Sequence, residues 1–169
     1  MTSRDVPGDA PRKVTELPPG IAPAVILVEP QLAENIGMTA RAMANFGLSE
    51  LRLVNPKNGW PKKGVREAAS GATHVLDRAT IFGSVAEAIA DCRYVLATTA
   101  RERGQMKRVF APEEAMGELV AREGQRTAVM FGRERVGLTN DEVSLADAII
   151  TFPVSPDFPS LNLAQAVLI

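Results

Sequence analysis

Polar and glycine-containing segments follow four apolar runs of this chain, and they carry residue types that could bind a ligand. The first segment contains Asn35 and Arg41, six residues apart, and the last contains Ser160 and Asn162. Small apolar residues flank Arg41, and an unpaired guanidinium is costly in such surroundings, so we expect it to have a functional partner. Asn35 has an equally good structural explanation, because asparagine is among the best helix N-caps. The four segments are residues 29–43, 98–108, 131–140 and 152–162.

The segment at 131–140 places the alternating charges of Arg133, Glu134 and Arg135 directly after Gly132. The missing side chain of Gly132 would let a ligand approach the backbone. A surface turn with self-compensating charges explains the same pattern. The segment lacks the lysine and the spacing of a P-loop, and the chain has no G-x-G-x-x-G, so nucleotide binding by those standard loops is disfavoured.

The segment at 98–108 is basic. Charge runs are usually solvated surface. On a chain whose net charge is −1, however, a basic loop beside a ligand site is where an RNA backbone would dock. The basic residues are Arg101, Arg103, Lys107 and Arg108.

The apolar runs that must position these segments alternate with helical patterns. This alternation predicts one mostly parallel α/β domain, in which ligands bind at the carboxyl ends of the strands. A helix followed by a strand is expected within residues 65–76. The other expected strands are residues 24–30, 48–56, 93–100, 126–132 and 148–154, and the other expected helices are 34–47, 84–92, 112–124 and 139–147.

Composition narrows the class of protein. The chain has 169 residues, 46% of them hydrophobic and 23% charged, as in an ordinary single domain. The single Cys92 excludes a disulfide framework, and the single His74 leaves few metal sites or Ser-His-Asp triads, so no metal is expected. No apolar run approaches the roughly 20 residues of a membrane span. We therefore expect a cytoplasmic protein, with residues 1–22, rich in proline and glycine, as a flexible leader.

Four stretches together resemble the SpoU branch of the SPOUT superfamily, and most closely the TrmJ-like tRNA 2′-O-methyltransferases. They read ILVEPQLAENIGMTARAMANFGLSELRLVNP, ATTAR, FGRERVGLTNDE and SLNLAQAV. The resemblance implies a Rossmann-like α/β fold ending in a deep trefoil knot, with S-adenosylmethionine bound in the knot. It also implies a homodimer that methylates RNA, with tRNA at position 32 of the anticodon loop as the first candidate. A ribosomal RNA substrate is an alternative, as is a non-catalytic module that binds RNA or S-adenosylmethionine.

Residue by residue, the resemblance assigns three groups. The catalytic group is Asn35, Arg41, Glu134, Ser160 and Asn162. The cofactor group is Ala97, Thr98, Thr99, Gly132, Arg133, Glu134, Ile150, Phe152, Pro153, Ser160 and Leu161. The RNA-binding group is Arg41 with the basic loop residues Arg101, Arg103, Lys107 and Arg108.

The family's methyltransferase domain corresponds to residues 23–169 here, and the sequence stops early in a helix predicted to begin near Leu161. We therefore expect that helix to be cut short. Arg41 is the family's candidate for helping the ribose hydroxyl to lose its proton. Because the pKa of a guanidinium lies above about 12, the group stays protonated, and we expect it to stabilise the developing alkoxide rather than to act as a base.

Overall fold

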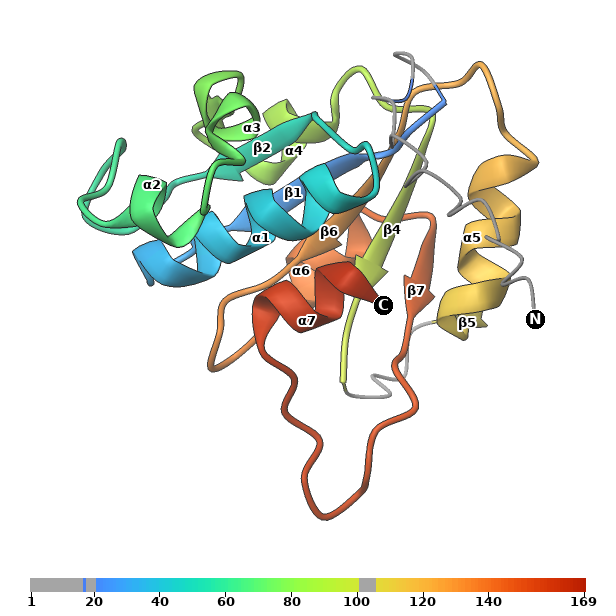
Figure 1. Ribbon diagram of the computed structural model, residues 1–169. Coiled ribbons are helices and arrows are strands. Elements are labelled where there is room, and N and C mark those ends of the chain that lie inside the picture. Colours follow the sequence, from blue (N-terminus) through green and yellow to red (C-terminus); the bar gives the residue numbers. More distant parts are fainter. Residues whose placement is uncertain (1–16, 18–20, 101–105) are drawn as a thin grey trace, which may run out of the picture.

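The computed structural model describes residues 17, 21–100 and 106–169 (Figure 1). Within these residues, seven strands form one sheet in the order β3-β2-β1-β6-β4-β7-β5. Every neighbouring pair is parallel, so the predicted α/β fold with a mostly parallel sheet is confirmed. The strands are β1 (Ala24–Val28), β2 (Leu51–Val54), β3 (Thr80–Phe82), β4 (Tyr94–Thr98), β5 (Val109–Phe110), β6 (Thr127–Phe131) and β7 (Ala148–Ile150).

Helices cover both faces of this sheet. Alternate side chains of each strand point to opposite faces, so Leu27 packs in the core beneath α1, α3, α5 and α7, and Ile26 packs in the core beneath α4 and α6. α1 and α7 lie side by side on the first face (Figure 1). The described helices are α1 (Ala33–Asn45), α2 (Val65–Ala68), α3 (Thr73–Asp77), α4 (Val85–Ile89), α5 (Pro112–Val120), α6 (Asn140–Ser144) and α7 (Leu163–Leu168).

The structure differs from the sequence prediction at two strands. The helix-then-strand expected at 65–76 is a pair of short helices, α2 and α3, and the strand β3 follows them. Positive φ angles at Ser70 and Gly71 turn the chain between the helices. Val75 and Leu76 belong to α3 and are buried in the core. A short apolar run of this kind is compatible with a helix or with a strand. The strand β5 was not predicted, because its two residues are too few to show a strand pattern.

Little of the amino-terminal segment belongs to the described residues, whereas the carboxyl-terminal segment is described to Ile169. The predicted leader lies outside the described residues except at Leu17, whose N–H donates to the Gly47 carbonyl at 3.0 Å, and at Ile21 and Ala22. The helix predicted near Leu161 is α7, which spans six residues. None of the described helices is long and apolar enough to cross a membrane. The knot and the domain boundary at residue 23 stay predictions.

Candidate functional site

A pocket of about 310 Å³ opens where β4, β6 and β7 end. Its walls come from three segments that are distant in the sequence, namely residues 98–100, 131–138 and 152–161, with α7 closing one side. The sheet order changes direction beside β6, and in parallel α/β sheets ligands bind at such a switch point. The pocket therefore lies at the edge where the polar segments were expected to meet.

Most residues of the predicted cofactor group line this pocket. Three do not: Ala97 and Ile150 are buried in the two cores, and Pro153 is exposed beside the pocket wall. As cofactor ligands, all members of the group stay predictions. Those in the wall are Thr98, Thr99, Gly132, Arg133, Glu134, Phe152, Ser160 and Leu161.

Glu134 joins the pocket to the start of α1. Its carboxylate accepts hydrogen bonds from the backbone N–H of Gln31 at 3.0 Å and of Leu32 at 3.1 Å, and from the Asn35 amide at 3.3 Å. Leu32 is the N-cap residue of α1 and makes no side-chain cap, so Glu134 supplies the acceptor that the helix start lacks. The interpretation of Asn35 as the N-cap is therefore wrong, because the helix begins at Ala33 and its cap comes from another segment.

Asn35 and Asn162 join α1 to α7. The buried Asn35 accepts a hydrogen bond at its Oδ1 from the Asn162 amide at 3.0 Å. The Oδ1 of Asn162 accepts from the Ala164 N–H at 3.0 Å, which makes Asn162 the N-cap of α7. A continuous chain of hydrogen bonds thus runs from Glu134 through Asn35 to Asn162. It ties together the three segments whose motifs were recognised separately in the sequence.

Arg133 holds the loop that follows β6. Its side chain is 13% exposed, and its guanidinium pairs with Glu29 at 2.8 Å and with both oxygens of Glu142, at 2.9 and 3.0 Å. The hydrogen bond from Arg133 lowers the pKa of Glu29. Burial would raise the pKa of Glu142, but hydrogen bonds from Arg133 and the Thr139 backbone outweigh it and lower that pKa. Both carboxylates stay ionised, so charge-assisted hydrogen bonds to Glu29 and to Glu142 hold Arg133 and the loop that carries it.

The partners of Arg133 were missed in the sequence. The spacing of Thr139 and Glu142 is that of a capping box, and the structure has this capping box at the start of α6. That spacing could have marked Glu142 as a fixed carboxylate near the loop. No local signal marks Glu29, because it lies 104 residues from Arg133.

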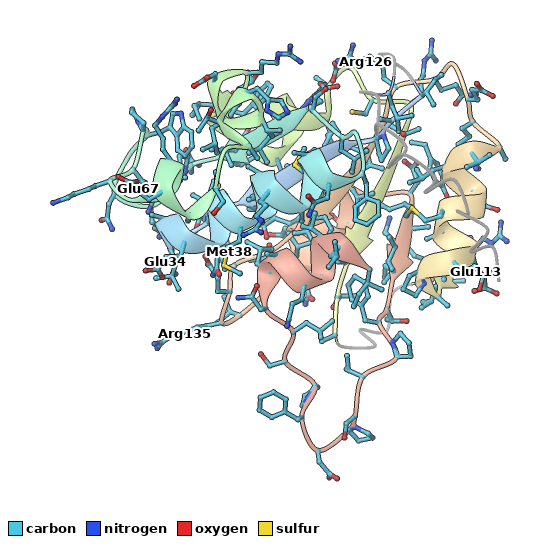
Figure 2. The ribbon with its side chains drawn as sticks, in the orientation of Figure 1. Glu34, Met38, Glu67, Glu113, Arg126 and Arg135 are labelled. Carbon is cyan, nitrogen blue, oxygen red and sulfur yellow. The ribbon has the colours of Figure 1, made fainter. Side chains whose placement is uncertain are left out.

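The loop after β6 has no room for a side chain at Gly132. A Cβ added at Gly132 would lie 2.2 Å from the Gly137 carbonyl carbon and 2.2 Å from the Leu138 nitrogen. The absence of a side chain is therefore explained by the loop backbone, and the expectation that it also lets a ligand approach stays a prediction. Arg135, which belongs to the same loop, also borders the pocket, and its exposed side chain extends outward (Figure 2).

Arg41 does not line the pocket of its own chain. It is exposed on α1 and shares that side of the helix with Glu34 and Met38, which Figure 2 labels. Among the described residues, no hydrogen bond or ion pair to its side chain is found. Ser160, by contrast, lies in the pocket wall. The structure thus brings four of the five predicted catalytic residues together and leaves Arg41 apart.

The basic segment is only partly described, since Arg101 and Arg103 lie outside the described residues. The Lys107 ammonium donates to the Ser144 carbonyl at 3.0 Å and to the Ala146 carbonyl, both at the end of α6. Arg108 stacks 4.8 Å from the ring centroid of Phe110. Lys107 therefore already has protein partners, whereas Arg108 is exposed and can still reach a ligand. Within the described part of the chain, no group of acidic, histidine or cysteine side chains could hold a metal ion.

Comparison with known proteins places these features in a family. The profile of the SpoU rRNA Methylase family matches residues 22–169. The solved structure of TrmJ from Z. mobilis ZM4 is 56% identical with a TM-score of 0.82, over 87% of this chain and 66% of that chain.

Two curated relatives are also similar. The tRNA (cytidine/uridine-2′-O-)-methyltransferase TrmJ of Yersinia pestis (strain Pestoides F) is 42% identical over 86% of this chain and 56% of its own length. The uncharacterized tRNA/rRNA methyltransferase LasT of Escherichia coli (strain K12) is 40% identical over 86% of this chain and 64% of its own length. The chain thus spans less than two thirds of the length of these relatives.

Proposed function

The chain belongs to the SpoU methylase family, and on this basis we propose that it is an S-adenosylmethionine-dependent RNA ribose 2′-O-methyltransferase acting on tRNA. The observation that carries the proposal is the chain of hydrogen bonds from Glu134 through Asn35 to Asn162 beside the pocket. It joins the family's three motif segments around one cavity. The 42% identity to a tRNA 2′-O-methyltransferase favours tRNA over ribosomal RNA.

The pocket suits S-adenosylmethionine in size and chemistry. Its volume of about 310 Å³ is within the range of small-molecule sites. Leu138, Leu161 and Ala166 offer apolar walls for a purine ring, while Thr99 and Ser160 offer hydroxyl groups that can orient the polar end. We propose that these residues hold the cofactor, which supplies a methyl group on a sulfonium that is already electrophilic and needs no metal.

The chain's own task is then to place the ribose hydroxyl in line with that methyl group. Orientation of this kind supplies several kcal/mol of the barrier, on the order of 7–11 in the best cases. Arg41 stabilises the negative charge that develops on the hydroxyl oxygen. The Glu134–Asn35–Asn162 chain keeps α1, which carries Arg41, in a fixed position relative to the pocket.

Because Arg41 lies outside the pocket of its own chain, we propose that two copies build the site. The side of α1 that carries Arg41 also carries Met38, which is 44% exposed, and the C-cap residue Phe46 is 60% exposed at the end of the helix. Exposed apolar side chains on one helix favour a protein partner. In such a homodimer Arg41 of one copy meets the pocket of the other.

The test is methyl transfer to separate tRNA and ribosomal RNA substrates, followed by mapping of the 2′-O-methylated nucleotide. We expect methylation of tRNA in the anticodon loop, at position 32. Methylation of ribosomal RNA alone would show that the substrate class is wrong. Calorimetric binding of S-adenosylmethionine without transfer to either RNA would overturn the enzymatic proposal in favour of a binding module.

A further inference from the structure

The segment between β7 and α7 holds an aromatic side chain in solvent beside the pocket. Phe158 is 75% exposed, and the segment that carries it projects from the body of the domain (Figure 1). Val154 and Pro159, which flank the tip, both line the pocket. Phe158 does not line the pocket itself, but it directly precedes Pro159, which does, so the exposed ring is carried next to the pocket wall.

A closed turn fixes the backbone at Phe158. The Phe158 N–H donates to the Ser155 carbonyl at 3.1 Å, and the Asp157 N–H donates to the Ser155 hydroxyl at 3.3 Å. Pro156 and Pro159 restrict φ on either side of this turn. An exposed ring held in this way loses less freedom on binding than one on an unrestrained loop.

We propose that Phe158 stacks on a base of the substrate RNA, next to the ribose that is methylated. This inference rests on the proposed function, which requires the target ribose at the pocket mouth and hence its base close by. Every base has a face that can stack on an aromatic ring. Asp157, the residue before Phe158, carries a carboxylate that repels phosphate, which favours a contact with a base over one with the RNA backbone. A second copy of this chain is the competing occupant, and the experiment separates the two.

The first experiment compares the variants F158A and F158Y. We expect F158A to raise the KM for RNA by about tenfold, within the roughly 5- to 150-fold that loss of one base stack costs. F158Y keeps the ring and should stay close to the unsubstituted protein. The affinity for S-adenosylmethionine and the sedimentation of the dimer should not change. Val120→Ala is the matched control, because Val120 is 74% exposed at the end of α5, outside the pocket wall.

The opposite results are equally clear. An unchanged KM for RNA in F158A would overturn the proposal, and so would a loss of dimer with a parallel loss of activity, which would make Phe158 a contact between copies.

A second readout does not depend on catalysis. In F158W, added RNA should quench the new tryptophan fluorescence, with the natural protein, whose single tryptophan is Trp60, as the background. Absence of this quenching would contradict stacking even if the proposed methyl transfer failed.

Discussion

At the scale of single residues, Glu134 does two things with one carboxylate. It faces the pocket, and it accepts hydrogen bonds from the backbone N–H groups of Gln31 and of Leu32, the N-cap residue of α1. A carboxylate is suited to this position, because the start of a helix carries partial positive charge and unsatisfied donors. The same side chain also accepts a hydrogen bond from Asn35, so we expect Glu134 to influence the proposed reaction through the position of α1.

The variant Glu134→Gln tests this double role. It keeps the shape but removes the charge, and its amide group offers one oxygen fewer to the backbone N–H groups of Gln31 and Leu32. We expect a loss of about 1 kcal/mol of stability, the usual worth of a cap, together with at least tenfold slower methyl transfer. Urea unfolding and initial rates measure the two effects. Glu123→Gln, an exposed carboxylate after α5, is the control and should change neither; equal behaviour of the two variants would refute the assignment.

Arg41 is expected to act in catalysis and not in folding. Because its side chain is exposed, Arg41→Ala should change the free energy of unfolding by less than about 0.5 kcal/mol. It should lower kcat about 10²- to 10³-fold, as the loss of a group that stabilises an oxyanion does. Arg41→Lys should recover part of this if a point charge suffices. Arg93→Ala, exposed before β4, is the control. Full turnover by the Arg41→Ala protein would rule out the role.

At the scale of elements, the site depends on two joints, the turn after β6 and the start of α7. In the first, Gly132 lets the backbone at Gly137 and Leu138 approach closely, and Arg133 then pins the loop to Glu29 and Glu142. In the second, Asn162 caps α7 with its oxygen and reaches Asn35 with its nitrogen. Each joint sets the direction of one wall of the pocket.

Gly132→Ala should disturb the first joint. The added methyl group meets backbone atoms at 2.2 Å, which cannot move aside without shifting the loop. We expect a loss of about 1–3 kcal/mol in stability and weaker S-adenosylmethionine binding, measured by thermal unfolding and calorimetry. Gly117→Ala provides the contrast, because that helical position has open space and alanine favours the helix. If Gly132→Ala binds the cofactor normally, the loop does not need this close approach.

Asn162→Asp separates the two bonds of the second joint. Aspartate can still cap α7 through its oxygen, but it has no N–H to donate to Asn35. The helix should therefore stay as stable as before, while methyl transfer should fall because α1 is no longer tied to α7. Unfolding and rate measurements on the same preparation decide this. A variant that loses stability and activity in proportion would indicate a cap and nothing more.

At the scale of the whole molecule, two largely buried arginines form ion pairs at the two edges of the sheet, while the net charge is close to zero. At the amino edge the buried Arg52 pairs with Glu50 and Asp91. Arg126 pairs with both of these carboxylates as well. At the carboxyl edge Arg133 pairs with Glu29 and Glu142. The net charge is −1, so RNA contacts must be local.

Because of these ion pairs, we expect the free energy of unfolding to decrease in acid. The hydrogen bond from Arg52 lowers the pKa of Asp91 from 3.8 to about 2. A carboxyl group whose pKa is lower in the folded state contributes stability above its unfolded pKa, and that stability is lost as the pH falls toward the folded pKa. The free energy of unfolding should therefore drop between about pH 4 and pH 2. Asp91→Asn should flatten this part of the curve, measured by urea unfolding at several pH values; an unchanged slope would show that the pair is too exposed to matter.

Much of this protein followed from the sequence alone. Runs of β-branched residues such as Val25–Val28 predicted the buried strands, and their alternation with helices predicted the parallel sheet. Because parallel strands end at one edge, the pocket's place was predictable as well. The motif residues Asn35, Glu134, Ser160 and Asn162 were assigned by resemblance to a family.

Only the tertiary structure decided how these residues are used. Glu134 accepts hydrogen bonds at the start of a helix about 100 residues earlier in the chain. Lys107 donates to the carbonyl groups of Ser144 and Ala146, and Arg41 lies outside the pocket of its own chain. Local spacing cannot reveal such relations, because a hydrogen bond depends on distance in space and not on distance along the chain. A short apolar run such as that at Val75 and Leu76 packs equally well from a helix or a strand, and only its neighbours in the core select one.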